Sequence, residues 1–184
     1  MKKLLLTASS SLLLASAASQ AFAYDGVITF NGTVNAETCT ISAAGGTNNG
    51  TVTLPQVAAS ALAKAADTAG TTQFSISLTN CSGTAKQAAA WFESGSNVNP
   101  ATGRLINTGT ASNVDVALYN IGSATPIAVG QGSGLFGSSG AGFNITGTAG
   151  SGAATLNYQA KYYATAAATA GSVVASVNYT IQYQ

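Results

Sequence analysis

The sequence of 184 residues contains no histidine, and only 6% of its residues are charged. Without histidine, neither a His/Cys zinc site nor a serine–histidine pair can be built, and no substitute base is evident. The acidic residues are scattered along the chain, and no spacing favours a catalytic carboxylate pair. We therefore expect no enzymatic activity, no cofactor and no metal site.

Basic residues are equally sparse, with six Lys and Arg in the whole chain. No basic stripe exists that could follow a phosphate backbone, so nucleic-acid binding is not expected. The glycine-rich stretch from Gly130 to Gly134 lacks the helix and lysine that would follow in a phosphate-binding loop. We interpret this stretch as a loop between strands.

The first 23 residues have the features of a secretory signal peptide. Lys2 and Lys3 precede an apolar run from Leu4 to Leu14, and Ala21-Phe22-Ala23 forms a small-x-small cleavage site. The run is too short to cross about 30 Å of hydrocarbon, so no membrane anchor is expected. The mature chain would begin at Tyr24 with four basic and five acidic residues, a net charge of −1. Such a low charge does little to keep copies apart.

The chain has two cysteines, Cys39 and Cys81. In an exported protein such a pair predicts one disulfide, whereas two free thiols are disfavoured by an oxidising compartment. The bond would close a loop of about 43 residues and contribute roughly 4 kcal/mol to stability. Its expected role is structural.

Alternation of apolar and polar residues dominates the mature chain and predicts β-strands. The Gly-, Asn- and Ser-rich segments between these runs predict turns, and the whole pattern predicts an all-β sandwich. An alanine-rich segment, 57–67, is the one helix candidate and predicts a single short helix or turn that crosses between the sheets. The expected strands cover residues 38–43, 51–54, 74–78, 88–92, 114–118, 156–164 and 173–183. The last of these places Val173, Ala175, Val177, Tyr179, Ile181 and Tyr183 on one face.

A further alternating segment follows the predicted cleavage site. Ile28, Phe30, Gly32 and Val34 share one face of an extended chain. The alternation alone suits the first edge strand of an ordinary sandwich. A glycine weakens an ordinary strand, however, so Gly32 favours a segment that docks closely against another backbone.

Several landmarks occur together along the chain: Val27–Val34, the following Cys39, the pair Asn80-Cys81, the run Tyr158–Thr165 and the ending Tyr179–Gln184. In this order and spacing the chain resembles the major structural subunits of type 1-like fimbriae, the adhesive pili of the chaperone–usher pathway. The resemblance covers nearly the whole mature chain.

The resemblance implies an incomplete immunoglobulin-like β-sandwich with six strands, a missing seventh strand and an N-terminal donor-strand extension. The extension would be residues 24–35 and the pilin domain residues 36–184. Ile28, Phe30, Gly32 and Val34 would enter the groove of a neighbouring copy by donor-strand exchange. That groove would lie beside the strand from Val173 to Tyr183, which a chaperone also binds.

The implied partners are neighbouring copies, other pilus subunits, a periplasmic chaperone and an outer-membrane usher. The implied location is the cell-surface fimbrium, reached through the periplasm. A minor pilus adapter, or a secreted coat or matrix subunit on the same fold, remains the alternative function. A periplasmic protein with a complete sandwich is a third possibility, and deletion of residues 24–35 would destabilise only that one.

Overall fold

The computed structural model describes residues 25–34, 36, 38–132, 136, 140 and 142–184. The predicted signal peptide, residues 1–23, lies outside the described residues. The chain divides into two units, Met1–Thr33 and Val34–Gln184, and each is described separately. Among the described residues there is no helix long and apolar enough to cross a membrane.

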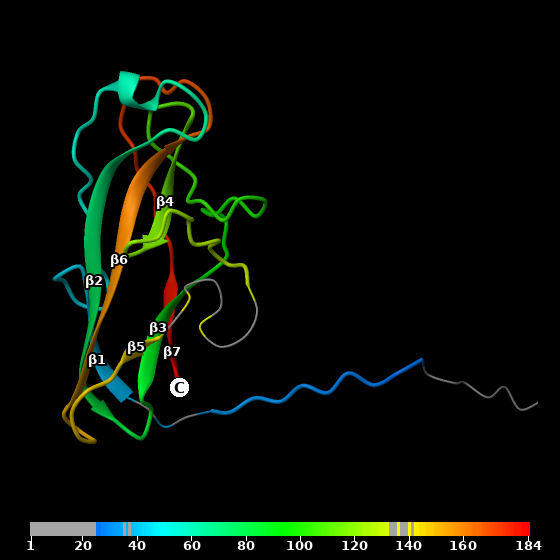
Figure 1. The fold of residues 1–184 in the computed structure, drawn as a ribbon, viewed down its shortest axis with the longest axis vertical. Coiled ribbons are helices and arrows are strands. Elements are labelled where there is room, and N and C mark those ends of the chain that lie inside the picture. Colours follow the sequence, from blue (N-terminus) through cyan, green and yellow to red (C-terminus); the bar gives the residue numbers. More distant parts are fainter. Residues whose placement is uncertain (1–24, 35, 37, 133–135, 137–139, 141) are drawn as a thin grey trace, which may run out of the picture. The chain divides into compact units, whose positions relative to one another are not determined.

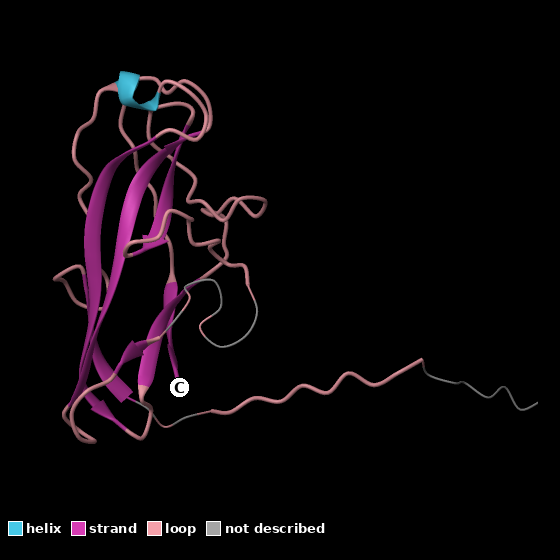
Figure 2. Cartoon of the chain, in the orientation of Figure 1, coloured by secondary structure: helices cyan, strands magenta, loops and turns pink. Residues whose placement is uncertain are grey.

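The larger unit consists of two antiparallel sheets (Figures 1 and 2). One sheet has the strand order β1-β2-β6-β4 and the other β5-β3-β7. A single turn of 3-10 helix, η1 (Ala59–Leu62), lies at the end of the sandwich shown at the top of Figure 1. The strands are β1 (Thr38–Ala43), β2 (Thr68–Ser82), β3 (Gln87–Phe92), β4 (Val114–Asn120), β5 (Phe143–Asn144), β6 (Gly152–Ala164) and β7 (Tyr179–Tyr183).

The alternation seen in the sequence determines which side chains form the core between the sheets. β2 and β6 pair over most of their length, so that Phe74 lies opposite Tyr158 and Ile76 opposite Leu156. The side chains of Ile76, Leu156 and Tyr158 are almost fully buried. From the other sheet, β3 contributes the buried Ala88, Ala90 and Phe92 to the same core.

Tyr158 lies at the centre of this core. Its ring meets Phe92 and Phe143 edge-on, with centroids 5.1 and 5.7 Å away, and the tilted ring of Phe74 is 5.8 Å away. The backbone N–H of Ala90 donates a hydrogen bond to the Tyr158 hydroxyl at 3.0 Å. The two sheets are thus joined by apolar contact and by one buried polar link.

The predicted all-β sandwich is confirmed, with differences in individual elements. Six strands have five or more residues, and the two-residue β5 was not predicted because two residues carry no periodic signal. Residues 57–67, predicted as a single short helix or turn, contain the single helical turn η1. Residues 51–54 and 173–178 form no strand, although both keep alternating exposure, because neither pairs with a neighbouring strand.

Candidate functional site

A groove of about 1020 Å³ opens between the two sheets of the larger unit. The segment Val173–Ile181 lines one side and Asn48–Leu54 lines the other. None of its lining residues is charged. Its depth is formed by side chains from both sheets and by Leu105, which precedes β4. The side chains from the sheets are Phe74, Ile76, Phe92, Val116, Leu118, Ala160 and Tyr162.

The backbone of β7 is hydrogen-bonded to β3 along one of its edges. β7 pairs with β3, where Gln184 and Gln87 exchange two hydrogen bonds of 2.9 Å. Just before β7, the Asn178 carbonyl accepts from the Glu93 N–H at 2.8 Å. Hydrogen-bonded pairs alternate in an antiparallel ladder, so even-numbered residues face β3. Tyr179 and Ile181 therefore direct their N–H and C=O groups toward the groove.

In residues 172–178, just before β7, the even-numbered residues again direct their hydrogen bonds away from the groove. The carbonyl of Ser172 accepts from the Ala111 N–H at 3.0 Å, and that of Val174 accepts from the Thr108 N–H at 2.8 Å. These residues are again even-numbered. Their odd-numbered neighbours Val173, Ala175 and Val177 are half-buried and pack on the core. One continuous backbone edge thus faces the groove.

The other side of the groove is the chain that follows β1. Ala43 and Gly46 close a tight turn, in which the Gly46 N–H donates to the Ala43 carbonyl at 2.9 Å. After this turn, Val52 and Leu54 are half-buried while Thr51 and Thr53 are exposed. Residues 51–54 therefore have the alternation of a strand but pair with no strand that the structure describes.

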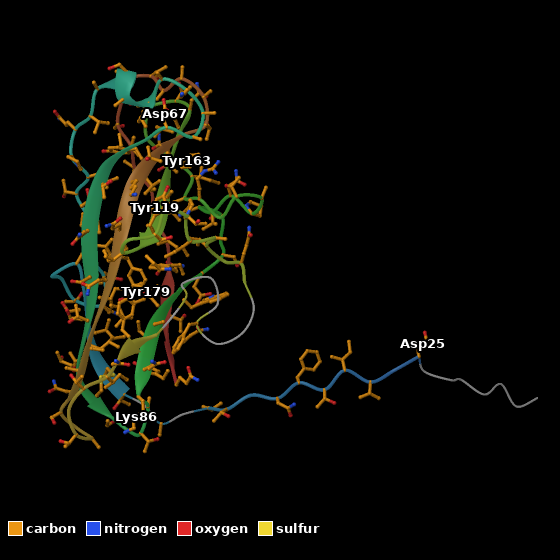
Figure 3. All side chains as sticks on the ribbon, viewed as in Figure 1. Asp25, Asp67, Lys86, Tyr119, Tyr163 and Tyr179 are labelled. Carbon is orange, nitrogen blue, oxygen red and sulfur yellow. A yellow bond between two sulfur atoms is a disulfide. The ribbon has the colours of Figure 1, made fainter. Side chains whose placement is uncertain are left out.

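A hydrogen bond joins the two sides of the groove. The hydroxyl of Tyr179, which is labelled in Figure 3, donates to the Asn48 carbonyl at 2.7 Å. Burial raises the pKa of Tyr179, so the phenol remains protonated at neutral pH and can donate. The turn after β1 is thereby tied to β7.

The smaller unit contains the segment predicted to dock. Residues 25–33 have no secondary structure, and neither does Val34, the first residue of the larger unit. Ile28, Phe30 and Val34 expose 80%, 89% and 100% of their surface. Gly32 does not have a positive φ, and a Cβ there would meet nothing within 4 Å. Its own chain therefore does not require a glycine at this position.

The predicted cysteines and most of the predicted groove residues lie where the sequence placed them. Cys39 and Cys81 form the predicted disulfide, which joins β1 to β2. Five of the predicted groove residues line the groove, whereas Tyr183 is half-buried in β7 and is not among the lining residues. Sequence reasoning missed Asn48 and Tyr162. Tyr162 belongs to the alternating run of β6, which indicated only a core strand, and the Asn48 carbonyl has no sequence signal.

The family model described as "Type-1 fimbrial protein, A" matches residues 54–184, which include η1 and six of the seven strands that the structure describes. The chain belongs to the type-1 fimbrial protein family. This fimbrial subunit is 46% identical over 174 residues to the major fimbrial subunit SMF-1 of Stenotrophomonas maltophilia, covering 93% of this chain and 99% of that protein. It is 40% identical over 179 residues to the F17 fimbrial protein of Escherichia coli, covering 94% and 95% respectively.

The fimbrial subunit also resembles the crystal structure of the P pilus rod subunit PapA. The TM-score is 0.55 at 20% identity, and the match covers 79% of this chain and 99% of PapA. At this identity the likeness shows the fold, which is the immunoglobulin-like pilin fold. As a member of its family, the chain is a structural pilus subunit of a cell-surface appendage and assembles with other pilus subunits. The family is one of structural proteins rather than enzymes.

Proposed function

We propose that this subunit polymerises by donor-strand exchange, in which residues 25–34 of one copy occupy the groove of the next. One observation carries the proposal. The structure has an uncharged groove beside an open strand edge, and the same chain has an exposed segment with the alternation that such an edge accepts. An added strand would complete the sheet by main-chain hydrogen bonds, while alternate side chains enter the groove.

The side chains supply enough free energy to drive this docking. Burying Ile28, Phe30 and Val34 stabilises the complex by about 1.5–3 kcal/mol each, or roughly 5–8 kcal/mol together. The cost of ordering the extension is subtracted from this sum. Because all three side chains are exposed in the free subunit, nearly their whole surface is available for burial.

The same groove binds successive partners while the subunit is exported to the cell surface. Residues 1–23 direct export, and a periplasmic chaperone occupies the groove until the extension of another copy replaces it at an outer-membrane usher. Residues 24–35 then act as the donor strand and residues 36–184 as the pilin domain that receives one. Val173, Ala175, Val177, Tyr179, Ile181 and Tyr183 form the strand beside which both partners dock.

Surface material sheared from cells tests the proposal on a denaturing gel, with and without heating. Donor-strand polymers dissociate slowly, so the unheated sample gives a ladder that collapses on heating to a monomer of about 16 kDa. Deletion of residues 24–35 leaves the chaperone-bound subunit folded but removes the ladder.

Substitution at Gly32 provides the sharper test. Gly32→Leu places a large side chain where the groove must accept none, and it abolishes the ladder. Thr33→Leu is the matched control, because Thr33 lies on the opposite face of the segment and keeps its side chain out of the groove. A normal ladder from Gly32→Leu would contradict the groove assignment.

A further inference from the structure

Residues 173–178 line the groove with alternating burial, yet they belong to no strand that the structure describes. A segment outside the sheet has no regular ladder of hydrogen bonds to keep it in place. Its backbone must be held by other groups if an incoming strand is to meet a ready edge. Those groups come from the loop between Leu105 and β4.

Asn107, in this loop, makes the contact that replaces a strand partner at Val174. Its side-chain oxygen accepts from the Val174 N–H at 2.9 Å, and the N–H of the next residue, Thr108, donates to the Val174 carbonyl at 2.8 Å. In a regular antiparallel pair, both bonds of a residue go to the backbone of one partner. Here the amide oxygen of Asn107 takes the place of the partner's carbonyl.

The same amide also fixes the loop that carries it. The Asn107 oxygen accepts a second bond, from the Gly109 N–H at 2.7 Å, and the amide nitrogen donates to the Ala111 carbonyl at 2.7 Å. Two N–H donors converge on one atom, which is the oxygen because only the oxygen of an amide accepts. One side chain thus makes three hydrogen bonds, which join the loop to itself and to residue 174.

Two glycines let this loop approach the segment closely. A Cβ at Gly109 would come within 2.2 Å of the Ser172 carbonyl oxygen, and one at Gly171 within 2.4 Å of the Ala111 nitrogen. The loop is anchored on β4 through Leu105, whose N–H and carbonyl are both hydrogen-bonded to that strand. The loop therefore carries the position of β4 to the segment beside the groove.

Because residue 174 is held from outside the groove, its neighbours face the opposite way. Val173 and Ala175 are half-buried, pack on the core and direct their own backbone groups toward the groove. We propose that Asn107 is a positioning residue for assembly, which keeps residues 173–177 preformed as an edge for the incoming strand. This role rests on the proposed function, donor-strand exchange. Without Asn107, docking must also order this segment, and that cost opposes assembly.

Substitution of Asn107 in the full-length chain tests this role. Asn107→Leu has a similar size but makes no hydrogen bond, and Asn107→Ala removes the side chain without adding apolar bulk. The measurement is the ratio of unheated ladder to total subunit, which separates assembly from folding. We expect the ratio to fall about tenfold in both variants, the factor that corresponds to the loss of one hydrogen bond from a group left unpaired.

Asn113→Gly is the matched control, because it removes a different amide bond at the same end of the sandwich. Its nitrogen donates to the carbonyl of Ala167, which is not among the residues that line the groove, at 2.9 Å. Asn113 has a positive φ of 58°, which glycine adopts without strain. The control should therefore leave the ratio of ladder to subunit unchanged.

Amide hydrogen exchange in the sheared polymer locates the effect. The Val174 N–H should exchange faster in Asn107→Leu than in the unsubstituted protein, while the amides of β6 keep their protection. Faster exchange throughout the domain would show a general loss of stability and would overturn the positioning role.

The remaining outcomes separate Asn107 from the mode of assembly. An unchanged ratio in both Asn107 variants, or an equal fall in Asn113→Gly, overturns the role of Asn107 and leaves donor-strand exchange standing. Failure of both Asn107 variants to accumulate would mean that the residue serves folding, and it would overturn the same role. Absence of any ladder from the unsubstituted protein would instead overturn donor-strand exchange itself.

Discussion

Tyr158 combines burial with a single polar contact. Its side chain is almost fully buried, and its hydroxyl accepts the N–H of Ala90. Tyr158→Phe keeps the ring but leaves that N–H without a partner in an apolar core. We expect a loss of about 1–3 kcal/mol in the free energy of unfolding, measured with guanidinium chloride.

Tyr163 is the matched control for this substitution, because its half-buried ring lies under the Arg104 guanidinium at 4.2 Å, a contact that phenylalanine retains. Tyr163→Phe should change the free energy of unfolding by less than about 0.5 kcal/mol. Equal losses in the two variants would show that the hydroxyl–Ala90 bond contributes nothing specific.

Tyr158 also makes the free energy of unfolding depend on pH in the alkaline range. Burial raises the pKa of Tyr158 from 10.0 to about 12, although the hydrogen bond from Ala90 acts in the opposite direction. Because the folded state favours the protonated phenol, this contribution is complete below pH 10 and is lost as the pH rises to about 12. The free energy of unfolding should fall across this window, and less steeply in Tyr158→Phe. Identical slopes in the two proteins would contradict the assignment.

At the residue scale, the sequence predicted more of the docking segment than of the groove. Ile28, Phe30, Gly32 and Val34 could be identified because an exposed, alternating segment depends on local pattern alone. The place of Tyr162 in the groove could not be predicted, since it depends on which strand faces which across the core. The link from Tyr179 to Asn48 joins residues 131 positions apart and uses a main-chain carbonyl, which no sequence pattern marks.

Among the elements, β1 depends most on a covalent bond. Among the described strands it lies at the edge of its sheet and pairs with β2, and the Cys39–Cys81 disulfide joins the two. Replacing both cysteines with serine should cost about 4 kcal/mol, the chain-entropy estimate for a loop of this length. The measurement is denaturant unfolding, with the unreduced protein as reference.

Reduction of the unsubstituted protein provides the check on that experiment. It removes the same bond without introducing serine, so both samples should lose comparable stability. A double serine variant as stable as the unreduced protein would show that the loop gains little freedom when the bond is absent.

Two segments show why an alternating sequence pattern does not always form a β-strand. Residues 173–178 alternate as clearly as β7 does, yet only residues 179–183 form a strand. Alternation reports which face is buried, whereas a strand also requires a partner along its edge. Residues 51–54 differ from prediction for the same reason. Both segments border the groove, so the two predicted strand segments that are not formed lie beside the proposed docking site.

At the scale of the whole molecule, sparse charge and assembly are connected. No residue that lines the groove is charged, and Asp25 is the one charged residue in the described part of the extension. The proposed contact between copies therefore depends on apolar burial and main-chain hydrogen bonds. Neither is weakened by the screening of charges.

Polymers should consequently resist salt. At about 1 M salt the screening length falls to roughly 3 Å, which removes most attraction between exposed charges. The unheated ladder should nonetheless be unchanged after such treatment, because apolar burial remains. Guanidinium chloride solvates apolar and peptide groups, so at strongly denaturing concentrations it should collapse the ladder slowly to monomer, as heating does. A ladder lost in sodium chloride alone would mean that ion pairs hold the copies together, and the uncharged groove would then not be the site of assembly.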